Sequence, residues 1–232
     1  MKNTEVLIIL GMHRSGTSCL AKCLMGMGVN FTLPKIMDGY WEKHVEYYHV
    51  NQLNDRIIKN WKNPVLKRNK FISILLKQKV KLFIKNNLYQ DDLIGLKDPR
   101  LCITFDYWFK NSSTIKILGI FRRPEEVGKS LEIRDEYGKT SFENGVNLWR
   151  IYNEQLLKVH DKHPFPILDF NLSKIEFGKS LERACFGLGI KYSDRIFSEI
   201  FRDKERHHYS ENISKKCKNV YSELQKRKIP IF

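Results

Sequence analysis

Length, composition and charge confine this protein to a few classes. Its 232 residues, 42% of them hydrophobic, are enough for one globular domain with a substantial core. Lysine and arginine number 41 against 26 acidic residues, and the formal charge of +15 favours an anionic partner such as nucleic acid, anionic lipid or a phosphorylated small molecule. The five cysteines are scattered and form no CxxC pair, which argues against a metal or redox motif of that kind and favours cytosolic thiols.

No apolar run approaches the roughly 20 residues that a membrane-spanning helix needs. The first such run, "VLIIL", is too short for a signal peptide. We therefore expect a cytoplasmic protein with a single domain over residues 1–232. Its polar tail, from about residue 203, is expected to form a peripheral helix or a partly mobile end. Nothing in the sequence indicates the oligomeric state.

The first elements along the chain are a strand and a helix. Residues 5–10, "EVLIIL", are rich in leucine and β-branched residues and stop at a glycine, which is typical of a buried parallel strand. After a loop, residues 17–28 place apolar side chains at helical spacing, and Gly26 and Gly28 mark the end of that helix. Residues 31–60 predict a loop that leads into a helix, and residues 71–88 predict an amphipathic helix.

The alternation continues through the rest of the chain. Strands are predicted at 92–97, 114–121 and 165–170. Pro124, followed by two glutamates, predicts a helix start. Residues 141–162 predict a long helix with four apolar side chains along one side: Phe142, Val146, Trp149 and Tyr152. Alternating strands and helices imply an α/β fold of three layers, α/β/α, with a mostly parallel central sheet. Together with the phosphate-binding pattern of residues 11–18, described next, they predict a fold like that of the P-loop-containing nucleotide hydrolases.

The loop after the first strand carries a phosphate-binding pattern. "GMHRSGTS" (11–18) has a glycine, four residues and a second glycine, followed by Thr17 and Ser18. Backbone N–H groups that close onto a helix N-terminus form an anion cradle. Kinases and GTPases place a lysine before the Ser/Thr, but Thr17 stands there in this chain, and the cation of the loop is Arg14. The pattern favours a donor with one phosphate at the loop and a less charged group to transfer.

Two further strands end in polar residues. "KDPR" follows the strand at 92–97, and "RRP" follows the strand at 114–121. In a parallel sheet, ligands bind beyond the carboxyl ends of the strands, so these segments and the loop are expected to meet. Asp98 and Arg100 are open to two interpretations, a local ion pair at the turn or a role in substrate binding.

These motifs resemble those of the sulfotransferases that use 3′-phosphoadenosine 5′-phosphosulfate (PAPS). "RSGTS" (14–18) is similar to the family's 5′-phosphosulfate loop, and Arg122 and Ser130, eight residues apart, are similar to its 3′-phosphate signature. The segments "GYWE", "LKDPRL" and "NLWRIYNEQLL" look most like the bacterial branch that is related to carbohydrate and tyrosylprotein sulfotransferases. The resemblance covers the first two-thirds of the chain, and beyond residue 170 it consists only of "RHH" at 206–208. The glycine-rich donor loop of the cytosolic branch has no clear counterpart here.

The resemblance implies a role for each matching residue. Arg14, Ser15, Gly16, Thr17 and Ser18 would bind the 5′-phosphosulfate, Arg122 and Ser130 the 3′-phosphate, and Lys97 the sulfuryl oxygens. PAPS would be the donor and adenosine 3′,5′-bisphosphate (PAP) the product. No metal is expected, because a sulfuryl group carries less charge than a γ-phosphoryl group, and fixed cations can stabilise the leaving phosphate. The acceptor would be a hydroxyl of a carbohydrate, glycolipid or peptide.

The general base is expected in "GYWEKHVE" (39–46). Relatives carry a glutamate soon after the first helix, and this segment offers Glu42, His44 and Glu46. Glu42 and Glu46 would share a face if the segment were helical, and Glu42 is preferred because it directly follows Tyr40 and Trp41. An ordinary charged helix face is the alternative for each of the three.

Three other functions are weighed against sulfuryl transfer. A P-loop nucleotide kinase would need the missing lysine and a strand-end aspartate for magnesium. A basic nucleic-acid-binding protein is suggested only by the charge of +15, and the chain has no zinc-finger spacing or RNA-binding aromatic motif, so no nucleic acid is expected. A catalytically inactive relative would keep the donor site and tolerate Glu42→Ala.

Overall fold

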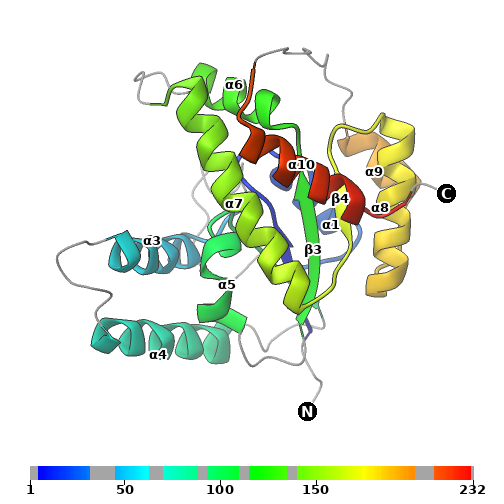
Figure 1. Cartoon of the computed structure of the whole chain (residues 1–232). Helices are drawn as coiled ribbons and strands as arrows, with labels where there is room; N and C mark the ends of the chain where they lie inside the picture. The colour runs from blue at the N-terminus through cyan, green and yellow to red at the C-terminus, as the bar shows by residue number, and fades with distance from the viewer. Residues whose placement is uncertain are drawn as a thin grey trace.

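The computed structural model describes residues 5–31, 45–62, 70–87, 93–109, 115–134, 140–201 and 212–230. Each described strand is followed by one or more helices (Figure 1). The strands are β1 (Glu5–Leu10), β2 (Leu93–Lys97), β3 (Ile115–Phe121) and β4 (Ile167–Asp169). The helices are α1 (Thr17–Gly26), α3 (Tyr48–Lys62), α4 (Lys70–Asn87), α5 (Leu101–Phe109), α6 (Pro124–Arg134), α7 (Phe142–Lys162), α8 (Lys174–Leu188), α9 (Asp194–Ile200) and α10 (Lys215–Arg227).

The described strands form one parallel sheet in the order β2-β1-β3-β4. Because β1 lies between β2 and β3, the carboxyl ends of these three strands are neighbours at one edge of the sheet. The predicted parallel sheet is confirmed, and each predicted strand differs from the observed one by no more than three residues. The largest difference is at β4, where the ladder with β3 includes only Ile167, Leu168 and Asp169.

Helices cover both faces of the sheet. Along β1, Val6, Ile8 and Leu10 point into a core shared with α3, α5, α7 and α10, whereas Leu7 and Ile9 point into a core shared with α1, α8 and α9. All five side chains are buried, as expected of a parallel strand with helices on both sides. The three-layer α/β/α architecture predicted from the sequence is therefore confirmed.

Local sequence signals account for several helix ends. The Ser141 side chain caps α7, and Ser173 and Glu176 form a capping box at the start of α8. Gly189 ends α8 in the left-handed conformation, with a φ of 68°. Helix α6 begins at Pro124, as predicted.

The tail of the chain contributes to the core. Within α10, Cys217, Val220 and Leu224 are buried, and the helix packs against α7 and β4. The "RHH" segment at 206–208 lies outside the described residues. No helix in the described part of the chain has both the length and the apolar character needed to span a bilayer.

Candidate functional site

The loop after β1 is fixed by two close approaches of its backbone. A Cβ on Gly11 would lie 2.6 Å from the carbonyl oxygen of Ile120, and a Cβ on Gly16 would lie 2.4 Å from Cδ2 of Phe170. Arg14 and Gly16 also have positive φ angles, 66° and 89°, in a region that residues other than glycine rarely adopt. The two glycines of the motif are therefore required by the shape of the loop itself.

This shape suits an anion. The loop leads directly into α1, and within the described residues no side chain caps that helix at its N-cap, Gly16. Ser15 is fully buried, and its Oγ has no hydrogen-bond partner in the described part of the chain. Buried hydroxyls usually have a partner, so an incoming group with acceptor oxygens fits here. The helix N-terminus favours a negative charge at the same place.

On one side, the loop meets the residues after β3. Arg14 Nε donates to Ser130 Oγ on α6 at 2.7 Å, and Arg122 Nη1 lies 3.5 Å from the carbonyl oxygen of Arg14. The Arg122 guanidinium lies 5.9 Å from the centre of the Phe170 ring. The sequence predicted all three polar residues as donor-binding, and the structure brings them together from segments more than 100 residues apart.

Further residues that the sequence analysis did not assign to a site hold Arg122. Glu126, which is buried, accepts a hydrogen bond from Arg122 Nε at 2.6 Å and another from Asn171 Nδ2 at 2.8 Å. Trp149 Nε1 donates to the Arg122 carbonyl at 2.9 Å. The sequence interpretation of Glu126 as part of a helix start missed this ion pair, although the spacing of four residues from Arg122 was a signal for it.

On its other side, the loop meets Lys97 at the end of β2. Lys97 is buried, and its Nζ donates to Ser18 Oγ at 3.1 Å and to Glu46 Oε1 at 2.6 Å. Burial lowers the pKa of the Lys97 ammonium, while the Glu46 carboxylate opposes this shift. A cation, a carboxylate and a loop hydroxyl are therefore in direct contact.

The position of Glu46 is fixed by its neighbours. Asn51 Nδ2, on α3, donates to the second carboxylate oxygen, Oε2, at 2.9 Å. The adjacent Tyr47 donates its hydroxyl to the Gly95 carbonyl in β2 at 3.2 Å. Of the three predicted candidates for the base, Glu42 and His44 lie outside the described residues. Glu46 is thus the candidate whose place in the site is known.

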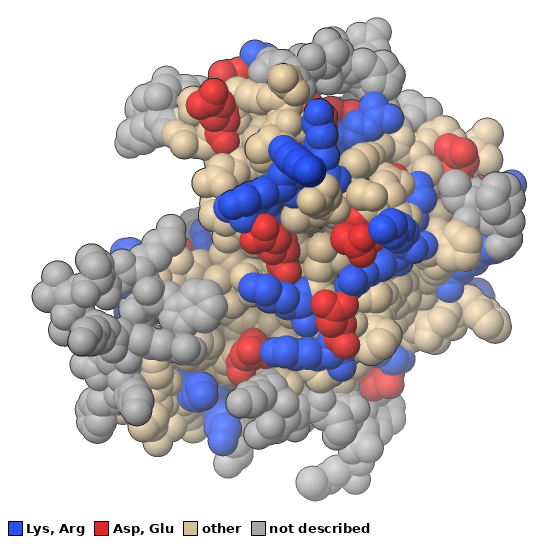
Figure 2. All heavy atoms as spheres, in the orientation of Figure 1, with Lys and Arg blue, Asp and Glu red and all other residues tan. Residues whose placement is uncertain are grey.

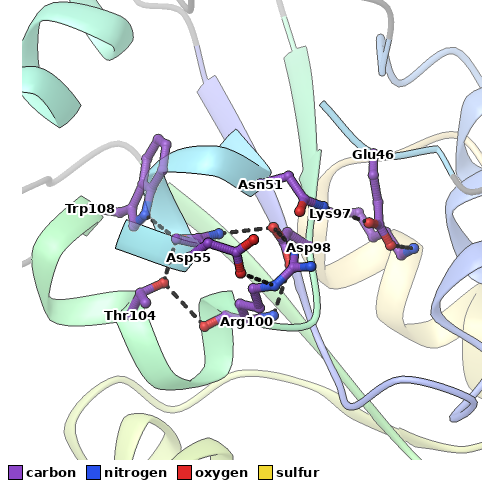
Figure 3. Close-up of polar contacts among 9 residues, drawn as sticks. Glu46, Asn51, Asp55, Lys97, Asp98, Arg100, Thr104 and Trp108 are labelled. Carbon is purple, nitrogen blue, oxygen red and sulfur yellow. Dashed lines mark hydrogen bonds and ion pairs between the residues drawn. The ribbon is translucent and has the colours of Figure 1, made fainter. Parts of the chain in front are cut away.

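Next to Lys97, a buried polar network joins α3 to α5 (Figure 3). Asn54 Nδ2 donates to Asp98 Oδ2 at 3.0 Å, and Asn54 Oδ1 accepts from Thr104 Oγ1 at 2.7 Å and from Trp108 Nε1 at 2.8 Å. The role of Asn54 could not be predicted from the sequence, because a single amide on a helix is most often exposed.

Arg100 forms ion pairs with two carboxylates. Its Nη1 lies 3.0 Å from Asp98 Oδ2, and its Nε lies 3.0 Å from Asp55 Oδ1. Burial lowers the pKa of the guanidinium, but the two carboxylates raise it by more. The local ion pair anticipated for "KDPR" is present, and Asp55 on α3 extends it beyond the turn.

Helices α6 and α3 carry Ser130 and Asn51, which lie at the two sides of the site. Among the described residues, no group of three or more His, Cys, Asp or Glu side chains is arranged to hold a metal ion.

Comparison with known proteins identifies the fold. No family model matches the sequence, and no curated protein matches it. The structure is similar to the sulfotransferase domain of the olefin synthase from Synechococcus PCC 7002, with a TM-score of 0.58 over 99% of this chain and 98% of that one, at 12% sequence identity. The sulfotransferase STF1 from Mycobacterium tuberculosis H37Rv gives a TM-score of 0.42 at 12% identity, over 94% of this chain and 71% of that one. The chain therefore has the P-loop-like α/β fold found in a sulfotransferase domain.

Proposed function

We propose that this protein is a sulfotransferase that moves the sulfuryl group of PAPS to a hydroxyl of an acceptor. The observation that carries the proposal is the position of Lys97, whose Nζ contacts both Ser18 of the phosphate loop and the carboxylate of Glu46. A cation beside the loop can take the place of the kinase lysine that Thr17 replaces, and a carboxylate beside that cation can accept a proton.

The donor would be held by the residues on the Arg14 side of the loop. The backbone of residues 14–18 and the N-terminus of α1 would bind the 5′-phosphosulfate, and Arg122 with Ser130 would bind the 3′-phosphate. The 2.7 Å contact between Arg14 and Ser130 supports this division, because one nucleotide can reach both groups only if they are adjacent. Bound PAPS would supply a sulfuryl group on a good leaving group, a nucleotide phosphate.

The acceptor would be activated on the Ser18 side. Glu46 would take the proton of the attacking hydroxyl, and Asn51 would hold the carboxylate in position. Lys97 would keep its proton and stabilise the charge that grows on the phosphate oxygen as its bond to sulfur breaks. We propose Glu46 rather than Glu42, the residue preferred from sequence, because the contacts of Glu46 with Lys97 and Asn51 support this role. We propose a carbohydrate or glycolipid hydroxyl as the acceptor.

Calorimetry with PAP and, separately, with ATP and magnesium tests the donor. We expect tight binding of PAP and little response to ATP, because the loop has Thr17 in place of the kinase lysine. Arg122→Ala should weaken PAP binding by about 10- to 100-fold, the usual range for losing hydrogen bonds to a charged group.

The matched control is Arg195→Ala, since Arg195 on α9 is 87% exposed and far from the loop in sequence. It should bind PAP as tightly as the wild-type protein. Preference for ATP with magnesium would favour the kinase alternative and contradict the proposal. Wild-type PAP affinity in Arg122→Ala would also contradict it.

A further inference from the structure

The region around α4 carries most of the excess positive charge of the protein. Between Asp55 and Asp91 the chain has no acidic residue. It has ten basic ones, which are Arg56, Lys59, Lys62, Lys67, Arg68, Lys70, Lys77, Lys79, Lys81 and Lys85. This segment supplies +10 of the formal charge of +15, and the proposed donor site does not use any of these residues.

One face of α4 is packed against the rest of the protein. Leu76 and Val80 are buried in the core, and the Phe83 ring lies 5.7 Å from the ring of Trp108 on α5. Ser73 Oγ lies 3.3 Å from the Tyr107 hydroxyl. The inner face therefore fixes the rotation of the helix about its axis.

The opposite face of α4 is apolar and exposed. Ile74 is 54% exposed, Leu75 43% and Leu82 58%. At about 100° per residue, these side chains and Gln78 lie within one sector of the helix, opposite Leu76 and Val80. The same geometry places Lys77 and Lys81 along one border of this sector and Lys79 along the other. We call these seven residues the outer face of α4.

The charges of the outer face differ from those elsewhere on the surface. On the face formed by α7 and α10, Figure 2 shows basic and acidic side chains interleaved, and ion pairs such as Arg150 with Glu154 join them. On α4, none of Lys77, Lys79 and Lys81 forms an ion pair with a described acidic residue. Lys77 instead lies over the Tyr107 ring at 5.7 Å. The outer face is thus both apolar and uniformly positive.

We propose that the outer face of α4 binds the surface of an anionic lipid bilayer. Ile74, Leu75 and Leu82 would enter the boundary between headgroups and acyl chains, and the flanking lysines would lie at the level of the lipid phosphates. Exposed aliphatic side chains flanked by lysines favour an anionic bilayer over the two alternative partners. A nucleic acid would use the lysines but would leave three aliphatic side chains in water, and a second copy of the chain would bring like charges together.

Flotation of the full chain with lipid vesicles tests the inference. We expect binding to vesicles of equal parts phosphatidylcholine and phosphatidylglycerol, and none to phosphatidylcholine alone. Two double variants should each bind at least about tenfold more weakly: Ile74→Ser with Leu82→Ser, and Lys79→Glu with Lys81→Glu. A lysine near such a surface contributes about 1 kcal/mol.

Matched controls come from other exposed positions. Ile175→Ser with Phe186→Ser changes two apolar side chains of α8 that are 73% and 89% exposed. Lys158→Glu with Lys179→Glu makes the same charge change on α7 and α8. Both control variants should bind like the wild-type protein. A second measurement detects binding directly. The emission of an environment-sensitive dye attached to Leu82→Cys should shift to the blue when anionic vesicles are added.

Several results would overturn the inference. These are absence of binding to anionic vesicles, equal losses in the control variants, binding to duplex DNA that survives the serine substitutions, and self-association without lipid that those substitutions abolish. The test uses no nucleotide, so its failure is distinct from failure of the proposed sulfuryl transfer.

Discussion

The proposed donor side of the site, formed by the loop with Arg122 and Ser130, and the proposed acceptor side, formed by Lys97, Glu46 and the side chains that hold them, are built in different ways. On the donor side, the backbone of residues 11–16 sets the geometry, and two glycines without room for a side chain keep its shape. On the acceptor side, side chains set the geometry: Asn51 holds Glu46, and Asn54 joins Asp98 to Thr104 and Trp108. The donor side therefore depends on the close packing of the loop backbone against β3 and Phe170, whereas the acceptor side depends on how α3 packs against β2 and α5.

This difference predicts that substitutions on the two sides affect different measurable properties. A substitution on the acceptor side should alter turnover or stability and leave nucleotide affinity as it is, because the loop keeps its own shape. The comparison becomes measurable when PAP affinity is determined for each variant beside kcat and the free energy of unfolding.

The largest effect is expected for Glu46→Gln. The amide keeps the shape of the side chain but cannot accept the proton, so kcat should fall by about 10²- to 10⁴-fold. Steady-state rates with PAPS and a hydroxyl acceptor measure the loss, and calorimetry should show unchanged PAP affinity.

Glu199→Gln makes the same change at an exposed position of α9 and should keep the wild-type rate. Glu42→Gln, prepared in parallel, gives the competing outcome. A full rate in Glu46→Gln together with a loss in Glu42→Gln would move the base to the residue preferred from sequence.

A smaller effect, on stability, is expected for Asn54→Ala. The substitution leaves the indole N–H of Trp108 without its acceptor in a buried place, whereas the Thr104 hydroxyl keeps the Arg100 carbonyl at 3.1 Å. Urea denaturation should show a loss of about 2–4 kcal/mol. Gln52→Ala, on the same helix but only partly buried, should cost less than about 0.5 kcal/mol. If Asn54→Ala weakened PAP binding while the protein stayed folded, the two sides would not be independent.

The smallest effect concerns pH. Burial lowers the pKa of Lys97 from its ordinary value of 10.5, so the folded protein releases this proton before the unfolded chain does. As pH rises through the folded pKa, kcat should fall because the ammonium is lost. Over the same range, up to pH 10.5, the free energy of unfolding should rise, since the unfolded state then binds more protons. Lys97→Met should remove both trends, and persistence of either in that variant would assign it to another group.

More of the proposed donor side than of the proposed acceptor side could be anticipated from the sequence. The loop, Arg122 and Ser130 were expected to meet because each follows a strand end or stands at a fixed separation in the chain, and Lys97, on the acceptor side, was named for the same reason. Glu126 was recognised only as part of a helix start, because its contact with Asn171 depends on the end of β4 lying beside α6. The contact between the end of β4 and α6 depends on the order of the strands in the sheet, which could not be predicted from the sequence.

On the acceptor side, the limit was the placement of α3. Asn51 and Asn54 are three residues apart and therefore share a helix face, but the sequence does not show that this face meets β2 and α5. The outer face of α4 was recognised only as half of an amphipathic pattern, because the side of a helix that stays exposed depends on its neighbours.

Residues 225–229 support the phosphate-binding loop of residues 11–18, and this has a consequence for synthesis. Gln225 and Lys228 hold Asp169 at 2.8 and 3.3 Å, and the backbone N–H of Ile229 donates to the Ile167 carbonyl at 2.9 Å. The turn that follows Asp169 places Phe170 beneath Gly16. Residues 11–18 are synthesised well before α10, whose contacts support them through Asp169 and Phe170, so a nascent chain should acquire the proposed nucleotide affinity only after α10 has been synthesised.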